Sequence, residues 1–233
     1  MKSDQKIVAV IPIKSVSDRV KSKNFREFYQ GKSLTELLIE KLLASTRIEK
    51  IYVSSDAISH KSYFENLGCH FIERDKSLCN NIVPWSDVIF EVISSIPESN
   101  GVDIGWCHTT SPLFNKYDDA IENYFKSIKS EETNGLITVT NLNEFIISEK
   151  KQPLNYSWGP WHRYSQDLEK LFKITGALFI ARKSEFLKNR YVISTNPKLY
   201  QVSSIESIDI DNEFDFELAK ILMKNKESLK KYD

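Results

Sequence analysis

The sequence predicts an α/β fold, with a mostly parallel sheet and helices on both faces. Apolar runs of strand length alternate with segments of helical period along the chain, which is typical of strand–helix–strand units. The first run, Ile7 to Ile13, is continuously apolar, as expected of a strand covered on both faces. A length of 233 residues without repeats or linkers predicts a single domain spanning residues 1–233.

Each element has a local signal. Ser33 resembles a helix N-cap, and Glu36 completes a capping box ahead of a leucine stripe. Pro84 marks the start of another helix, which Pro97 ends. Further helices are expected over 59–67, 118–128 and from about 212 onward, and strands over 51–53, 70–72, 103–107, 136–139, 176–180 and 208–210.

The periodicity fails between about Asn141 and Lys173. Trp158, Trp161 and Tyr164 stand there among polar residues and prolines. Long excursions of this kind are commonly functional or form an interface, and aromatic residues are enriched at interfaces. We therefore expect segment 141–173 to support a homodimer, with a local aromatic core or a ligand platform as alternatives.

Composition limits the partners and the compartment. Lys+Arg and Asp+Glu both number 32, which argues against a nucleic-acid partner. Three cysteines without metal-ligand spacing suit free thiols in a reducing compartment. No apolar run reaches the ~18 residues of a membrane span, and no signal-peptide core follows the N-terminus. We expect a cytoplasmic protein with no membrane partner.

A basic loop follows the first strand, where open α/β sheets bind ligands. Arginine gives planar contacts to phosphate and lysine a mobile charge, and backbone N–H groups around the two serines can form a nest for anions. A solvated basic loop is the alternative, since the P-loop and dinucleotide-binding glycine patterns are absent. The candidates are Lys14, Ser15, Ser17, Arg19, Lys21, Lys23 and Asn24.

Near the other end, Asp209 and Asp211 flank Ile210. Side chains two apart share one face of a strand, so both carboxylates can reach one Mg²⁺, which binds few carboxylates plus water and substrate phosphate. Helix capping is the alternative. Capping would account for Asn212 and Asp215 and also for Asp211, but it leaves Asp209 unexplained.

A third candidate group follows the predicted strand 103–107. Thr110 and Ser111 stand at the same sheet edge as the basic loop, directly after His108. They are candidates for ligand contact, although a lone histidine is as readily structural. Neither a Ser-His-Asp order nor a G-x-S-x-G elbow is present.

Together these segments resemble the cytidylyltransferases that make CMP-activated sialic acids and related 3-deoxy-ulosonic acids. Residues 11–24 read I-P-I-K-S-V-S-D-R-V-K-S-K-N, against I-P-A-R-G-G-S-K-R-x-x-x-K-N in that family. Further matches follow in family order: 53–56 with V-S-T-D, Arg74 and Leu78 with R-P-x-x-L, 110–113 with T-S-P-L, 176–180 with G-A-I-Y-I, and 207–219 with S-x-D-I-D-T-P-E-D-L-E-L-A.

The resemblance implies a Rossmann-like nucleotidyltransferase fold and a cytoplasmic enzyme of surface-glycan biosynthesis. It would transfer CMP from CTP to a sialic, legionaminic, pseudaminic or octulosonic-type acid and release pyrophosphate. Arg19 and Lys23 would neutralise the triphosphate, and Asp209 and Asp211 would hold Mg²⁺. By the same resemblance the nucleotide-binding set is Lys14, Ser15, Ser17, Arg19, Lys23, Asn24 and Arg74, and the acceptor set is His108, Thr110, Ser111 and segment 141–173.

The chain also departs from the family pattern. Lys14 replaces arginine, Ser15 and Val16 replace two glycines, and Asp18 adds a negative charge. His108 and Thr109 replace Gln-Pro, and Phe114 replaces arginine. These changes leave open a different acceptor or a loss of activity.

Two alternative functions remain. The first is a metal-dependent glycosyltransferase with residues 209–211 as its D-x-D motif, which the position near the chain end disfavours. The second is a non-catalytic binding protein on the same fold.

Overall fold

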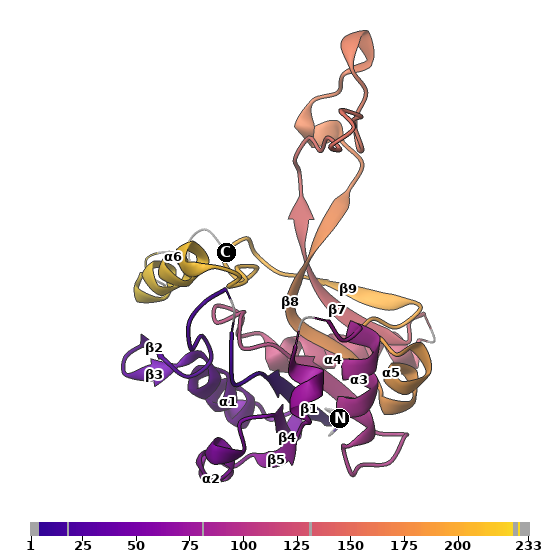
Figure 1. Ribbon diagram of the computed structural model, residues 1–233. Coiled ribbons are helices and arrows are strands. Elements are labelled where there is room, and N and C mark those ends of the chain that lie inside the picture. The colour runs from indigo at the N-terminus through magenta and orange to yellow at the C-terminus, as the bar shows by residue number, and fades with distance from the viewer. Residues whose placement is uncertain (1–4, 18, 81, 131, 226–227, 229–233) are drawn as a thin grey trace.

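A seven-stranded sheet forms the centre of the computed structural model, which describes residues 5–17, 19–80, 82–130, 132–225 and 228 (Figure 1). The strand order is β5-β4-β1-β6-β8-β7-β9. The strands are β1 (Ile7–Ile13), β4 (Ile48–Ser55), β5 (His70–Glu73), β6 (Asp103–Cys107), β7 (Gly135–Leu142), β8 (Leu171–Arg182) and β9 (Pro197–Gln201).

The predicted sheet is confirmed as mostly parallel. β1 pairs in parallel with β4 and β6, β4 with β5, and β7 with β9. Only β8 is reversed within this sheet, since it runs antiparallel to both β6 and β7. The carboxyl ends of β1, β4 and β6 therefore meet at one edge, as the placement of the candidate residues requires.

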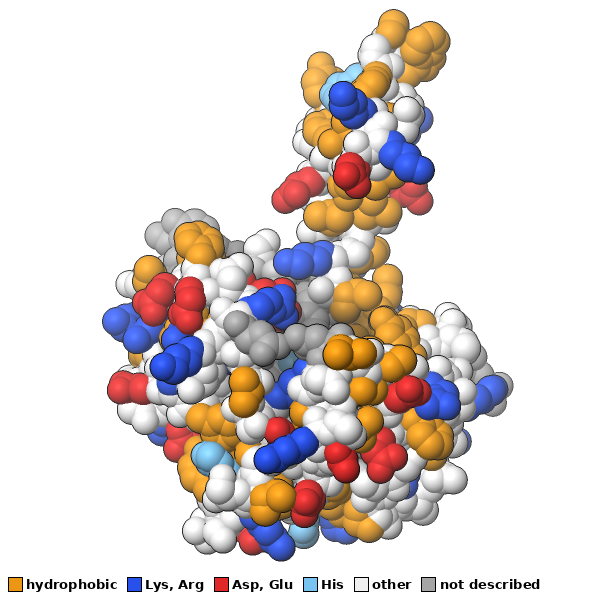
Figure 2. All heavy atoms as spheres, viewed as in Figure 1, with side chains coloured by type: hydrophobic (Ala, Val, Ile, Leu, Met, Phe, Trp, Pro, Cys, Tyr) orange, Lys and Arg blue, Asp and Glu red, His pale blue; other side chains and the backbone are white. Residues whose placement is uncertain are grey.

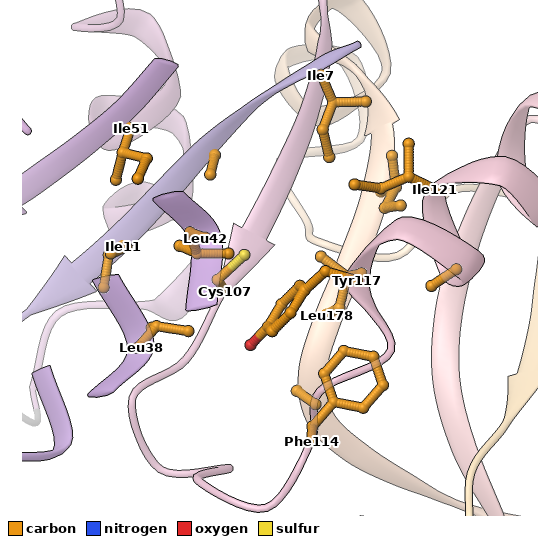
Figure 3. Packing of buried hydrophobic residues seen from close by; sticks show 14 of the residues in the cluster. Ile7, Ile11, Leu38, Leu42, Ile51, Cys107, Phe114, Tyr117, Ile121 and Leu178 are labelled. Atoms are coloured by element: carbon orange, nitrogen blue, oxygen red, sulfur yellow. The ribbon is translucent and has the colours of Figure 1, made fainter. Parts of the chain in front are cut away.

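Helices cover both faces, as predicted. The helices are α1 (Leu34–Ala44), α2 (Lys61–Asn66), α3 (Trp85–Ser94), α4 (Tyr117–Lys129), α5 (Lys183–Asn189) and α6 (Glu213–Lys224). Alternate β1 side chains divide the core: Ile7 and Ile11 pack with residues of α1, α2 and α4 (Figure 3), and Val8 and Val10 with residues of α3 and α5. Double coverage explains why β1 is apolar throughout.

A third cluster lies beside the sheet and includes the short hairpin of β2 (Glu27–Tyr29) and β3 (Lys32–Ser33). Val20 from the basic loop, Ile210 from the aspartate segment and Phe216 from α6 are each at most 2% exposed in this cluster. It thereby joins the two candidate halves of the site.

The aperiodic segment forms an arm. β7 and β8 continue together away from the sheet, and the chain between them rises far above the domain (Figure 1). The last paired residues are Leu142 and Leu171, so the strands enclose slightly less than the predicted segment 141–173. We call residues 141–173 the arm.

The structure corrects some predicted elements. Residues 208–210 are not a strand, because a turn at 204–207 and the cap of α6 leave too little chain for a ladder. Ile210 instead donates one backbone hydrogen bond to the Thr110 carbonyl, at 2.9 Å. The sequence analysis did not predict the β2–β3 hairpin, α5 or β9. Among the described residues, no helix has the length and apolar character needed to cross a membrane.

The N-terminus of α6 is capped by Asn212, whose side chain accepts from the Asp215 N–H, while the Asp215 carboxylate accepts from the Asn212 N–H. We expect Asn212→Ala to lower the free energy of unfolding by about 1 kcal/mol, because the Asp215 N–H loses its side-chain acceptor. Urea denaturation checks this, and Asn212→Ser, which can still cap, is the control. Equal losses in both variants would contradict the capping role.

Candidate active site

A cleft of about 530 Å³ opens at the carboxyl ends of β1 and β6. It brings together residues that lie far apart in sequence, as the analysis of the sequence predicts. The predicted residues that line it are Lys14, Ser17, Arg19, Lys23, Asn24, Arg74, His108, Thr110, Asp209 and Asp211.

Two cations connect the basic loop to the aspartate segment. Lys23 is buried, and its Nζ donates to the Ile210 carbonyl at 2.8 Å. Burial lowers the pKa of Lys23, and the charge of Asp209 partly offsets that effect. Arg19 is exposed, and its Nη2 lies 2.8 Å from Asp211 Oδ1. The loop is therefore attached to the segment that carries both carboxylates.

Asp209 has an unusual environment. Burial raises the pKa of its carboxyl, and the nearby charge of Asp211 raises it further, against a hydrogen bond from Thr110 and the charge of Lys23. Its Oδ1 is buried and has no hydrogen-bond partner among the described residues. A buried oxygen without a partner is costly, so this atom is suited to a ligand or a cation.

The carboxylate pair fits Mg²⁺. Within the described part of the chain, no three His, Cys, Asp or Glu side chains gather as a metal site. Two carboxylates alone suit Mg²⁺, which completes its shell with water and substrate phosphate. The capping alternative does not explain the pair, because Asn212 and Asp215 cap α6 while the Asp211 carboxylate contacts Arg19.

Ser15 departs from the prediction. Its backbone N–H donates to Asp56 Oδ1 at 2.7 Å, and its Oγ donates to Asp56 Oδ2 at 2.5 Å. Burial alone would raise the pKa of Asp56, but the hydrogen bonds to its carboxylate, with those from Ser15 the strongest, together lower the pKa. The predicted phosphate nest at Ser15 is therefore not formed, because both donors are committed to Asp56.

Asn24 and Arg74 brace the loop from within. Asn24 donates to the Lys14 carbonyl at 3.3 Å and accepts from Thr109 Oγ1 at 2.7 Å. Arg74 is buried and donates to the Ile13 carbonyl at 2.6 Å. Both line the cleft while fixing the backbone where β1 enters the loop. Asp18, the added negative charge, lies outside the described residues.

Two of the three candidate acceptor residues line the cleft, and one does not. Thr110 and His108 line the cleft, and burial lowers the pKa of His108 to about 4, so its imidazole is neutral. Ser111 is a correction: it is buried, does not line the cleft, and donates to the Thr175 carbonyl at 3.3 Å. A residue whose side chain is directed into the β6–β8 junction cannot contact an acceptor from this position.

The sequence analysis missed Trp85 and Thr109, which also line the cleft. Trp85 directly follows Pro84, which the sequence marks as a helix start. Its position there could have identified it as a candidate site residue. Thr109 was part of the Thr-Thr-Ser-Pro run without a role of its own.

Residues 8–227 match the family described as Cytidylyltransferase. An N-acylneuraminate cytidylyltransferase of Escherichia coli O18:K1:H7 is 25% identical over 98% of this chain and 54% of its own length. A Helicobacter pylori protein named as pseudaminic acid cytidylyltransferase and hydrolase is 25% identical over 87% of this chain and 40% of its own. The chain thus spans about half the length of the curated relatives it matches.

Solved structures agree on the fold. A CMP:2-keto-3-deoxy-manno-octonic acid synthetase complexed with CTP aligns with a TM-score of 0.65 and 15% identity, covering 95% of this chain and 100% of that one. A 4-diphosphocytidyl-2C-methyl-D-erythritol synthase from Anaerococcus prevotii aligns with a TM-score of 0.63 and 10% identity, over 94% and 99%. With the family match extending from β1 through α6, this chain belongs to the cytidylyltransferase family.

Proposed function

We propose that this protein transfers CMP from CTP to an acidic sugar of the sialic, legionaminic, pseudaminic or octulosonic type and releases pyrophosphate. The observation that carries the proposal is the buried Asp209 Oδ1, which has no hydrogen-bond partner in the described part of the chain and lies beside a loop of cations. Family membership and relatives named for sialic and pseudaminic acids support it. Three free thiols suit the cytoplasm, where we place the synthesis of this surface-glycan precursor.

The cleft residues can supply most of what phosphoryl-type transfer requires, namely positioning and charge neutralisation. Lys23 would present a fixed, buried ammonium to the triphosphate, and Arg19 an exposed guanidinium at the rim. Asp209 and Asp211 would hold Mg²⁺, which when bound supplies charge neutralisation and acidifies a bound hydroxyl. The acceptor's anomeric oxygen would form a bond to the α-phosphorus and give its proton to solvent, while the α–β phosphoanhydride bond breaks and pyrophosphate leaves.

The Arg19–Asp211 ion pair does not oppose this role. Both side chains are more than half exposed, and exposed pairs contribute little to stability. Arg19 can therefore exchange Asp211 for phosphate when CTP arrives, which frees the carboxylate for the metal.

The alternative functions are weaker. A glycosyltransferase D-x-D reading does not explain why the aspartate segment is attached to the loop after β1 through Lys23. A non-catalytic protein is compatible with the Ser15–Asp56 hydrogen bonds, but it gives no reason for a buried carboxylate oxygen that finds no partner among the residues the structure describes.

The test is pyrophosphate release with each of the four nucleoside triphosphates, a panel of acidic sugars, and Mg²⁺ or EDTA. We expect turnover with CTP and Mg²⁺ only.

In the same assay, the turnover of Asp209→Asn and of Asp211→Asn should each fall by more than about tenfold, or ~1.4 kcal/mol of barrier. The reason is that an amide keeps the shape of the carboxylate and loses its charge. The control is Asp87→Asn, an exposed carboxylate on α3 paired with Arg190. Smaller losses in both cleft variants would contradict the metal role.

The loop generates a second expectation. Lys14→Ala should mainly weaken CTP binding, whereas Arg19→Ala and Lys23→Ala should reduce turnover as well. A charged hydrogen bond to phosphate contributes on the order of 1–3 kcal/mol, which corresponds to roughly five- to 150-fold in affinity. Calorimetric titration with CTP measures this loss, and Lys14→Arg should retain binding.

Unfolding midpoints serve as the control for that series, because Lys23 is buried and its replacement can disturb the fold. If all three alanine variants bind CTP as the parent does, the loop is only a solvated basic turn.

We also propose a homodimer formed through the arm. Trp158, Trp161 and Tyr164 are 55%, 75% and 76% exposed, and Figure 2 shows hydrophobic side chains gathered along the arm. A local core does not explain them, because the ring contacts found within the described arm join Phe145, Tyr156 and His162. Phe145 stacks on His162, and Tyr156 meets both of these rings edge to face. Large exposed aromatic groups of this kind favour a protein partner.

Light scattering at micromolar concentration should give the mass of a dimer, and the double variant Trp161→Asp/Tyr164→Asp should give that of a monomer, because two charges would have to be buried. Phe214→Asp, at an equally exposed aromatic on α6, is the matched control and should remain dimeric. A monomeric parent would contradict the proposal.

A further inference from the structure

One side of the cleft is an aromatic wall formed by Trp85 and His108. Trp106 and Phe179, both at most 4% exposed, lie behind it. The Trp85 and Trp106 rings meet edge to face at 5.8 Å between centroids, and His108 packs on Phe179 at 5.9 Å and faces Trp85 at 6.5 Å. Trp85 and His108 line the cleft, so a ligand there meets carbon-rich surface on rigid support.

His108 has no ring nitrogen left for a ligand. Trp106 Nε1 lies 2.7 Å from His108 Nε2, and an indole N–H can only donate, so Nε2 is the acceptor and carries no proton. The proton is therefore on Nδ1, which lies on the side of Gly176, whose backbone hydrogen-bonds the imidazole. Gly176 has φ +75°, and a Cβ there would lie 3.4 Å from Nδ1.

The wall stands next to the carboxylate pair. The same Cβ position at Gly176 would lie 3.8 Å from Asp209 Oδ2, so His108 and Asp209 border one another across that glycine. The wall rests on β6 and β8, whereas Arg74 and Asp56 lie on the β4 side of β1.

The direction of attack indicates which side of the cleft would hold the triphosphate and which the acceptor. In a displacement at phosphorus, the attacking and leaving oxygens lie roughly in line. If the loop after β1 holds the triphosphate, the acceptor approaches from the far side of Asp209, which is the side of the wall. This step rests on the proposed function.

We propose that Trp85 and His108 select an acidic sugar that turns a methyl or deoxy carbon, rather than a hydroxyl, toward them. A hydroxyl pressed against the wall loses water without gaining a partner, whereas a methyl group gains from burial. Apolar pockets reject an added hydroxyl only moderately, so the preference should be on the order of 10- to 100-fold in kcat/KM.

The experiment compares acids that differ by one oxygen, with CTP and Mg²⁺. The acids are N-acetylneuraminate with its 7-, 8- and 9-deoxy analogues, and 3-deoxy-octulosonate with its 8-deoxy analogue. We expect the kcat/KM of one deoxy acid to exceed that of its parent acid by about 10- to 100-fold. His108→Gln, which offers an amide to a hydroxyl, and Trp85→Ala should each remove most of that preference.

The matched control is Phe90→Ala, at a half-exposed aromatic of α3 that packs against Arg190 and does not line the cleft. This variant should keep the deoxy preference. Unfolding midpoints of all variants show whether a loss reflects damage to α3.

The outcomes separate the two proposals. Turnover without a deoxy preference would contradict the selecting role of Trp85 and His108, and so would a preference that survives in both variants. Either result leaves the proposed function intact. No turnover with any acid counts against the proposed function. Calorimetric titration of the same acids needs no turnover, and equal affinities within each pair would overturn the wall on their own.

Discussion

The whole site depends on the burial of Val20 and Ile210 in one apolar cluster. Val20 lies in the loop after β1 and Ile210 lies between the two aspartates, and both are fully buried. Ile210 is held in the cluster while Asp209 and Asp211 on either side of it line the cleft, so the buried residue anchors the segment that carries both carboxylates. Apolar packing, which is itself non-directional, thus helps to position the carboxylates of Asp209 and Asp211. The hydrogen bond from Lys23 to the Ile210 carbonyl then fixes the distance between loop and segment.

This arrangement makes a buried charge tolerable. An ammonium removed from water needs compensation, and Lys23 has a carbonyl at 2.8 Å together with the charge of Asp209. The compensation is incomplete on both sides, since burial still lowers the pKa of Lys23 and raises that of Asp209. A bound triphosphate would further compensate the charge of Lys23, and a bound cation would compensate that of Asp209. The charged groups of the cleft are thus in place before a ligand binds.

The sequence predicted those features that have a local cause. The apolar run of β1 reflects coverage on both faces, and the Ser33–Glu36 pair forms the capping box that its spacing indicates. Features that depend on distant partners were missed. Nothing near Ser15 reveals that Asp56 will take both of its donors, and the reversal of β8 depends on the arm. The segment 208–210 has strand composition, but its neighbours leave it no room for a ladder.

The two clearest departures from the family motif share one physical consequence. Ser15 replaces a glycine and directs its hydrogen bonds to Asp56, and His108 replaces a glutamine and directs both ring nitrogens to Trp106 and Gly176. In each place the polar atoms of the substituting side chain hydrogen-bond within the protein. The cleft therefore keeps its charged side chains, while the polar atoms of these two neutral side chains are already paired. Lys23 and Asp209 are then the cleft residues whose charges remain incompletely compensated within the protein.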